Sequence, residues 1–165
     1  MISSSRPSLA TIDRNHPVAI RGARLEDATE LARLAGELGY PTDVEPMRER
    51  LRELTGSGHH WVAVAADTET TLAGWVHVAR CIALETGAYA EILGLVVDAR
   101  VRRAGVGRAL IGAAERWAAE RGLARMTVRS NAVRLESHPF YAALGYARPK
   151  SQHVYQKRLE RNADG

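Results

Sequence analysis

The sequence predicts an α+β fold in three layers, with helices on both faces of a mixed, mostly antiparallel sheet. The 165 residues are 45% hydrophobic, which suits a single domain with a core of its own. Segments with helical spacing of apolar residues alternate with short apolar segments typical of strands. In the second half, a strand, a helix and a strand follow one another, as in a right-handed parallel crossover.

The first half is predicted to contain two helices framed by strands. Residues 18–23 form a short apolar strand, and residues 25–38 carry Leu and Ala at helical spacing up to the glycine at position 39. Thr42 and Glu45 have the spacing of a capping box, which predicts a second helix that ends at the glycines of residues 56–58. An antiparallel hairpin of strands 60–67 and 71–84 is expected to follow.

The second half supplies the crossover and the end of the domain. Residues 88–97 predict a strand, a helix with apolar residues from 106 to 118 follows, and residues 124–130 predict the next strand. A last helix over 135–144 and a closing strand over 153–159 complete the fold. We expect residues 1–16 to be a mobile tail, residues 17–160 to be the single domain, and residues 161–165 to be a C-terminal tail.

Composition excludes several classes of protein. Cys81 is the only cysteine, so no intrachain disulfide can form, and no apolar run approaches the roughly 18 residues of a membrane span. The first residues lack the apolar segment of a secretory signal, and we therefore expect a cytoplasmic protein that does not bind a membrane. The net charge is +4, but the arginines are scattered along the chain. This pattern favours compositional bias over a nucleic-acid partner.

The junction after the strand at 88–97 runs through basic residues and two glycines into an amphipathic helix. Gly105 and Gly107 allow a tight loop with inward-pointing N–H groups, and the helix adds the positive end of its dipole. Arg102 and Arg108 add formal charge. These features favour a phosphate ligand, whereas the alternative is a simple turn that needs glycine for its geometry and has solvated arginines.

Two familiar phosphate motifs are absent from this junction. A dinucleotide fingerprint would need glycine at position 110, which is Leu110, and no Gly-Lys-Ser/Thr of a Walker A loop is present. The pattern that fits is Arg102-x-x-Gly105-x-Gly107 between a strand and a helix. This pattern resembles the cofactor signature of the GNAT family of N-acetyltransferases.

A second signature of the same family is recognisable downstream. Asn131 is followed by Phe140-Tyr141 and then by a Leu-Gly-Tyr sequence at residues 144–146. The spacing from Asn131 to Phe140 is longer than in the common form, which leaves the role of Asn131 open. The longer form, with Arg134 and His138 before the aromatic pair, is similar to a bacterial branch that includes aminoalkylphosphonate N-acetyltransferases.

The resemblance implies that the chain binds acetyl-CoA as its co-substrate. Backbone amides of the junction would hold the pyrophosphate, and the strand before it would pair with the pantetheine arm where two strands splay apart. No metal is expected, because adjacent histidines such as His59 and His60 point to opposite sides of a strand. The cofactor-binding residues that we expect are Leu95, Val96, Val97, Arg102, Arg103, Ala104, Gly105, Val106, Gly107, Arg108, Ala109, Asn131 and Tyr141.

An amine acceptor must lose a proton before it attacks a thioester, which calls for a general base. Glu91 is our candidate, at a position similar to that of the base in relatives that acetylate histones. Period-two alternation places it on one strand face with Leu93, Leu95 and Val97. The alternative is that Glu91 is an ordinary solvated glutamate, and His77 is a second candidate for the base. Relatives of the aminophosphonate branch carry a carboxylate at the position that is Gly94 in this sequence.

The resemblance also places Tyr141 near the CoA sulfur, where its phenol would protonate the leaving thiolate. A backbone N–H near Val96 or Val97 is the expected oxyanion donor. We therefore predict an acetyl-CoA-dependent N-acetyltransferase that acts on a primary amine, most simply a small molecule, by direct attack in a ternary complex. The first two predicted helices and the connection over residues 81–90 would select the acceptor. The alternative is a catalytically inactive CoA-binding sensor or partner module, and a homodimer stays open.

Overall fold

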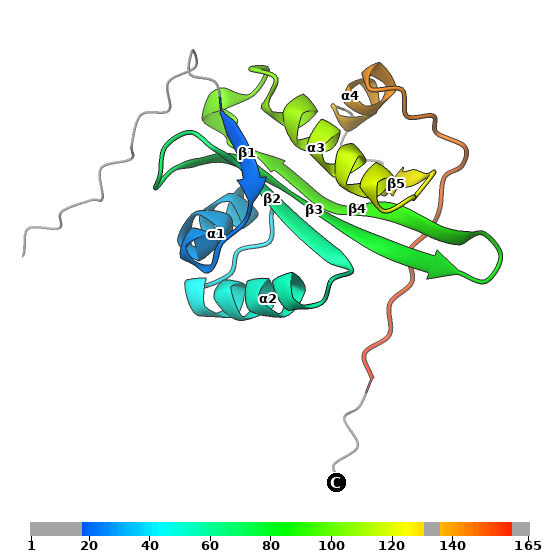
Figure 1. Ribbon diagram of the computed structural model, residues 1–165, viewed down its shortest axis with the longest axis horizontal. Helices are drawn as coiled ribbons and strands as arrows, with labels where there is room; N and C mark the ends of the chain where they lie inside the picture. Colours follow the sequence, from blue (N-terminus) through cyan, green and yellow to red (C-terminus); the bar gives the residue numbers. More distant parts are fainter. Residues whose placement is uncertain (1–17, 131–135, 160–165) are drawn as a thin grey trace, which may run out of the picture. The chain divides into compact units, whose positions relative to one another are not determined.

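The computed structural model describes residues 18–130 and 136–159. The chain divides into two compact units, one that ends at Arg129 and one that begins at Ser130. The first unit holds one five-stranded sheet in the order β1-β2-β3-β4-β5 (Figure 1). Its strands are β1 (Ala19–Gly22), β2 (His60–Ala66), β3 (Leu72–Ala83), β4 (Gly87–Val97) and β5 (Met126–Val128). The first four are antiparallel neighbours, and β4 and β5 are parallel, which confirms the mixed, mostly antiparallel sheet.

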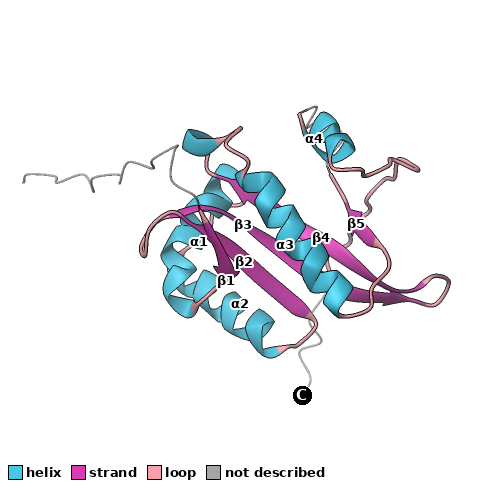
Figure 2. Ribbon diagram, turned by 45° about the horizontal axis from the view of Figure 1, so that its top comes forward, coloured by secondary structure: helices cyan, strands magenta, loops and turns pink. Residues whose placement is uncertain are grey.

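Helices cover both faces of this sheet, as predicted. A 3-10 turn, η1 (Leu25–Asp27), leads into α1 (Ala28–Glu37), and α2 (Val44–Gly56) follows it. On the other face, α3 (Val106–Glu120) lies along the sheet after a second 3-10 turn, η2 (Ala99–Val101) (Figure 2). The chain passes from β4 through α3 to β5, so the parallel crossover that the sequence predicts is confirmed.

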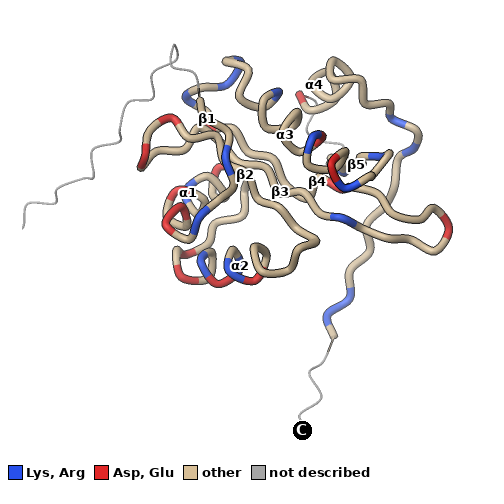
Figure 3. The backbone as a smooth tube through the Cα atoms, in the orientation of Figure 1, with Lys and Arg blue, Asp and Glu red and all other residues tan. Residues whose placement is uncertain are grey.

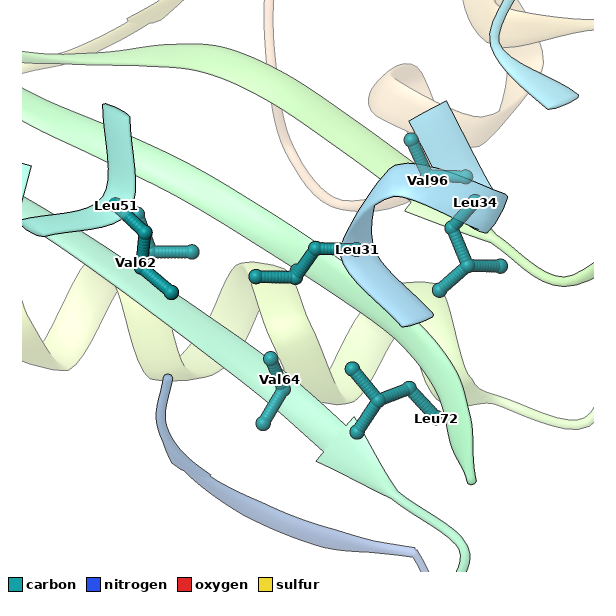
Figure 4. Packing of buried hydrophobic residues seen from close by; sticks show 7 residues of the cluster. All are labelled: Leu31, Leu34, Leu51, Val62, Val64, Leu72 and Val96. Carbon is teal, nitrogen blue, oxygen red and sulfur yellow. The ribbon is translucent and has the colours of Figure 1, made fainter. Parts of the chain in front are cut away.

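The alternation of side chains along β2 shows how the two faces are filled. Val62 and Val64 belong to a buried cluster with Leu31 of α1 and Leu51 of α2 (Figure 4). Each of these residues is at most 7% exposed, and burying such a side chain contributes about 1.5–3 kcal/mol. Trp61 points to the opposite face, where its ring stacks on Trp117 of α3 with centroids 6.5 Å apart. One strand therefore ties both helical layers to the sheet.

The start of α2 differs from the predicted capping box. Asp43, not Thr42, is the N-cap residue, and it makes no side-chain hydrogen bond to the helix N–H groups. The Thr42 hydroxyl instead accepts a hydrogen bond from Arg50 at 3.3 Å. The helix forms because its apolar side packs against α1 and β2, which outweighs a missing cap of about 1 kcal/mol.

A β-bulge divides β4 into two halves. Gly94 pairs with His77 of β3, whereas the next β3 residue, Val78, pairs with Ile92, so Leu93 is the extra residue. Such a bulge bends a strand and changes which side its groups face. On the other side of β4, β5 ends at Val128 opposite Ile92. Within the described residues no strand continues along β4 beyond the bulge on that side.

The second unit contains the short helix α4 (Ser137–Ala143), and the start predicted for this helix, residue 135, lies outside the described residues. The closing strand predicted over 153–159 is wrong, because these residues form no regular structure. Val154, Tyr155 and Leu159 are between 79% and 90% exposed. The two adjacent apolar residues and the charged residues after them do not alternate, so the segment has no single apolar face with which to join a sheet.

Candidate active site

The loop between β4 and α3 has the geometry that the glycine pattern predicts. Gly105 is the N-cap of α3 with φ of 82°, a left-handed conformation that glycine adopts without a steric penalty. Arg103 also has a positive φ, 67°, which is uncommon for a residue with a side chain. Val101 and Val106 are buried at 3% and 4% exposure and hold the two ends of the loop. The residues between them are exposed.

The N-terminus of α3 has no cap of its own. Gly105 has no side chain, and the first helical N–H with a backbone acceptor is that of Ala109, which donates to the Gly105 carbonyl at 3.0 Å. In the part of the chain that the structure describes, the N–H groups of Val106, Gly107 and Arg108 have no acceptor. Basic residues gather where the chain enters this helix (Figure 3). The loop thus presents free donors and positive charge to solvent, an arrangement that suits a phosphate.

The C-terminal half of β4 has an unpaired edge beside this loop. Asp98 donates its N–H to the Ala73 carbonyl of β3 at 2.9 Å, and the Val96 carbonyl contacts Gly74 of β3. Backbone groups of alternate residues point to the same side of a strand. The N–H and C=O groups of Leu95 and Val97 therefore point away from β3, to the edge that β5 does not reach.

A buried ion-pair network fixes the loop to α1. Asp98 is fully buried, and its carboxylate contacts Arg33 at 2.9 Å and Arg100 at 2.7 Å. Burial alone would raise the pKa of Asp98, but the hydrogen bonds from Arg100 and Arg33 outweigh it and lower the pKa to about 2. Arg33 also pairs with Glu30, and Glu37 of the same helix accepts a hydrogen bond from the Ala99 N–H at 3.0 Å. The first turn after β4 is thus held rigidly by α1.

Glu91 lies in the other half of β4 and is buried at 4% exposure. Its carboxylate forms an ion pair with Arg129, which follows β5 and is itself 59% exposed. The pair forms because β4 and β5 are parallel and Thr127, two residues before Arg129, lies opposite Glu91 in the register. Sequence reasoning missed Arg129, since it carries no motif and only the strand register brings it to Glu91.

The bulge changes the face on which Glu91 lies. Glu91 pairs with Ala79, whereas Leu95 beyond the bulge pairs with Val76 of the same strand. Ala79 and Val76 point to opposite faces of the sheet because side chains alternate along a strand. The prediction that Glu91 shares a face with Leu95 and Val97 is therefore wrong, and Leu93, the bulge residue, has no partner that would place it. Glu91 instead faces the side covered by α1 and α2, the same side as the buried cluster of Figure 4.

Two histidines lie on this same face. The Nε2 atom of His77 is 2.9 Å from Nδ1 of His60. Burial, followed by the nearby His60, lowers the pKa of His77 to about 4, so His77 is neutral at pH 7. The residue of β4 that pairs with His77 is Gly94. A Cβ atom at position 94 would come within 2.7 Å of the Trp75 ring. The ring occupies the space that a side chain would need, so this chain has no room for a carboxylate at position 94.

The remaining predicted residues divide between the units. Tyr141 lies on α4 in the second unit, where its ring makes edge contacts with Phe140 and Tyr146 at centroid distances of 5.1 and 5.7 Å. Asn131 lies outside the described residues. Burial raises the pKa of the Cys81 thiol, as does the charge of Glu91, so Cys81 is protonated at neutral pH.

Neither a metal site nor a membrane helix is present in the part of the chain that is described. No group of three or more His, Cys, Asp or Glu side chains in residues 18–130 and 136–159 is arranged to hold a metal ion. No helix in these residues is both long and apolar enough to cross a membrane.

The fold is similar to that of solved acetyltransferases and of a transcriptional regulator. The aminoglycoside N-acetyltransferase AAC(6')-Iy, solved with the bisubstrate analogue CoA-S-monomethyl-acetylneamine, has 19% identity and a TM-score of 0.76 over 86% of this chain and 99% of its own. A transcriptional regulator from Bacillus halodurans C-125 has 22% identity and a TM-score of 0.77 over 85% and 99%. A ribosomal-protein-alanine N-acetyltransferase from Brucella melitensis has 21% identity and a TM-score of 0.68 over 85% and 100%.

The sequence itself identifies the family. No curated protein matches this chain. The profile of the acetyltransferase (GNAT) family, however, matches residues 25–146, which include strands β2 to β5 and helices α1 to α4. The similarity to solved structures establishes the fold alone. The family profile matches the sequence itself and covers most of it. The chain is therefore an acetyltransferase that belongs to the GNAT family.

Proposed function

We propose that this protein is an acetyl-CoA-dependent N-acetyltransferase that transfers acetyl to a primary amine by direct attack within a ternary complex. The observation that carries the proposal is the uncapped N-terminus of α3 beside the unpaired edge of β4. One diphosphate and one extended amide-bearing arm would satisfy both at once. CoA has these two parts in sequence, and a solved structure of AAC(6')-Iy contains CoA.

In this proposal the donor is held mainly by the main chain. The N–H groups of Gly105, Val106, Gly107 and Arg108 bind the pyrophosphate, with charge from Arg102 and Arg103. The amides of the pantetheine arm pair with Leu95 and Val97 as an added strand would. The thioester carbonyl would then lie near the Val97 N–H group, which points to the open edge, as the oxyanion requires. The N–H of Val96, the other donor expected, points to β3. The N–H groups of Ala104 and Ala109 already donate to the Val101 and Gly105 carbonyls, so these two residues would shape the loop rather than bind the phosphates.

The acid–base roles stay with the residues that the sequence singled out. Glu91 removes the proton from the amine, directly or through a water molecule, as the nitrogen attacks the acetyl carbon. Tyr141 gives a proton to the departing CoA thiolate, a role that rests on the family resemblance. Asn131 stays a cofactor-binding prediction on the same ground. His77 is the alternative base, although a group with a pKa of about 4 holds a proton weakly at pH 7.

The acceptor is proposed to be a small-molecule amine. AAC(6')-Iy is an aminoglycoside N-acetyltransferase, whereas the Brucella melitensis relative in fold is an enzyme for ribosomal-protein alanine, so the fold does not choose between small and protein acceptors. The longer second signature favours the aminoalkylphosphonate branch. Acidic and basic residues are interspersed along α2 (Figure 3). The absence of a nucleic-acid partner stays a prediction. Action in the cytoplasm, no membrane association and a homodimer stay predictions.

The experiment that tests this proposal is an acceptor screen with acetyl-CoA. Release of the free CoA thiol is measured with aminophosphonates, amino acids, polyamines, aminoglycosides and peptides. We expect turnover with at least one class and tighter binding of CoA than of CoA fragments without the pyrophosphate. Thermal stabilisation by CoA without turnover on any amine would instead identify the inactive sensor or partner module. Absence of any CoA binding would contradict both.

A further inference from the structure

The ion pair of Glu91 and Arg129 joins a buried group to an exposed one. Glu91 is 4% exposed, whereas the Arg129 side chain is 59% exposed. The guanidinium therefore covers the carboxylate on the side of their contact and is itself open to solvent. One of its nitrogens, NH1, is bonded to the carboxylate, and arginine has five N–H donors in all. Arg129 can thus bind a second anion.

Among the described residues that are seen to interact with Arg129, Glu91 is the one that carries a negative charge. Cys81 and Tyr89 are the neighbours of Arg129 on β3 and β4, and neither is a carboxylate. The Tyr89 side chain forms a hydrogen bond with Arg129, and burial, followed by the charge of Glu91, raises the pKa of the Cys81 thiol. Arg125 lies over the Tyr89 ring at 4.8 Å and adds another positive charge. Among these described residues, Glu91 is the single carboxylate against two guanidinium groups. A polycationic acceptor would be repelled here, and an acceptor with an anionic group would be attracted.

We propose that Arg129 is a specificity-determining residue that selects zwitterionic acceptors, in which a short spacer joins a primary ammonium to a carboxylate or phosphonate. This inference rests on the proposed function. The acceptor's anion binds the Arg129 guanidinium and draws it from Glu91, while the acceptor's ammonium takes its place at the Glu91 carboxylate. One ion pair, Glu91–Arg129, exists before the exchange and two exist after it, so the buried carboxylate is never left without a cation.

The length of the acceptor follows from the same contact. Because Glu91 and Arg129 are in direct contact, the two charged groups of the acceptor must be separated by only a few covalent bonds. Amino acids and aminophosphonates with one to three carbons in the spacer fit this requirement. Longer spacers would have to fold back on themselves, at a cost in conformational entropy.

The test compares matched acceptors on the unmodified protein. The pairs are β-alanine and β-alaninamide, which share the amine and the spacer, with 6-aminohexanoate as the long-spacer acid and an aminoglycoside as the polycation. We expect kcat/KM to be about tenfold or more higher for β-alanine than for its amide, as for a hydrogen-bonded charge. The amine of the amide has the lower pKa, so more of it is in the reactive neutral form. Intrinsic reactivity alone would therefore favour the amide, the opposite of the predicted preference. Equal rates for the two, or a preference for the aminoglycoside, would overturn it.

Arg129→Met should remove the preference, mainly by raising KM for β-alanine toward that of the amide. Arg129→Lys should restore part of it, because lysine keeps the charge but not the planar fork. Arg116→Met is the matched control, since Arg116 is an exposed arginine on α3, on the face of the sheet opposite to Glu91, and it should keep the preference. A preference that persists in Arg129→Met would reject the proposal.

Failure of the proposed function is distinguishable from failure of this inference. If no amine is acetylated, the function is wrong, and calorimetric binding of β-alanine and its amide to the CoA-bound protein decides the role of Arg129 alone. Tighter binding of β-alanine that Arg129→Met abolishes would support the inference. Binding that does not differ between the acid and the amide would overturn it.

Discussion

The two halves of β4 meet at Leu93 and are built on different principles. Beyond the bulge, Leu95 and Val97 present main-chain groups to an open edge, and the following loop presents uncapped helix N–H groups. Before the bulge, Glu91 is a buried side chain whose properties depend on one partner, Arg129. The half of β4 after the bulge, with its main-chain groups, suits the donor, which is the same molecule in every turnover. The half before the bulge depends on side chains that can change without altering the fold, as acceptor choice requires.

The largest effect is expected at the side-chain half of the strand. Glu91→Gln keeps the size of the residue but removes its ability to take a proton, so kcat should fall by about 10²- to 10⁴-fold while CoA affinity is retained. Steady-state kinetics over a range of pH checks this, and the acidic limb of the profile should flatten. Glu85→Gln, at the exposed turn between β3 and β4, is the matched control. An unchanged rate would transfer the base role to His77 or to water.

The main-chain half is tested by placing a negative charge at the start of α3. Gly107→Asp should weaken CoA binding by roughly 100-fold through repulsion of the pyrophosphate. The free protein should not lose stability, because an acidic residue in the first helical turn interacts favourably with the dipole. Calorimetry and thermal unfolding separate the two effects. Ala119→Asp, at the other end of α3, adds the same charge and should leave CoA affinity unchanged; equal losses in both variants would remove the phosphate site from the loop.

Tyr141 tests whether the second unit supplies the acid. Tyr141→Phe removes one hydroxyl, and kcat should fall by about 10- to 100-fold with little change in CoA affinity. Tyr146→Phe changes the neighbouring ring in the same way and is the control. If the kcat of the two variants is the same at every pH, another group protonates the thiolate.

The smallest expected effect concerns the anchor of the loop. The pKa of Asp98 is about 2 in the folded protein, below its ordinary value of 3.8, so its ion pairs stabilise the fold above about pH 4 and are lost as pH falls toward 2. That difference corresponds to about 2 kcal/mol. Asp98→Asn should lower the free energy of unfolding by about this amount at pH 7 and by less at pH 2. Urea unfolding at the two pH values measures it, and a constant difference would contradict the assignment.

The same division explains what the sequence could predict. The glycines at 105 and 107, the helix that they begin and the strand before it are local features, so their arrangement follows from spacing alone. The bulge at Leu93 arises from pairing with β3. Because of it, Glu91 lies on the face of the sheet opposite to that of Leu95, whereas simple alternation predicts the same face. The contact from Glu91 to Arg129 spans 38 residues, and the network of Asp98 joins the loop to a helix near the start of the domain. Such long-range contacts depend on strand register, which no local pattern specifies.

The claim on which the account depends is that free main-chain N–H groups after β4 hold the diphosphate of the donor. Amide hydrogen exchange, measured residue by residue with and without CoA, tests it most directly. Exchange should slow at Leu95 and Val97 and at the amides of Gly105, Val106, Gly107 and Arg108, with the N-terminal half of β4 unchanged. Unaltered exchange at the start of α3 in the presence of saturating CoA would contradict the account.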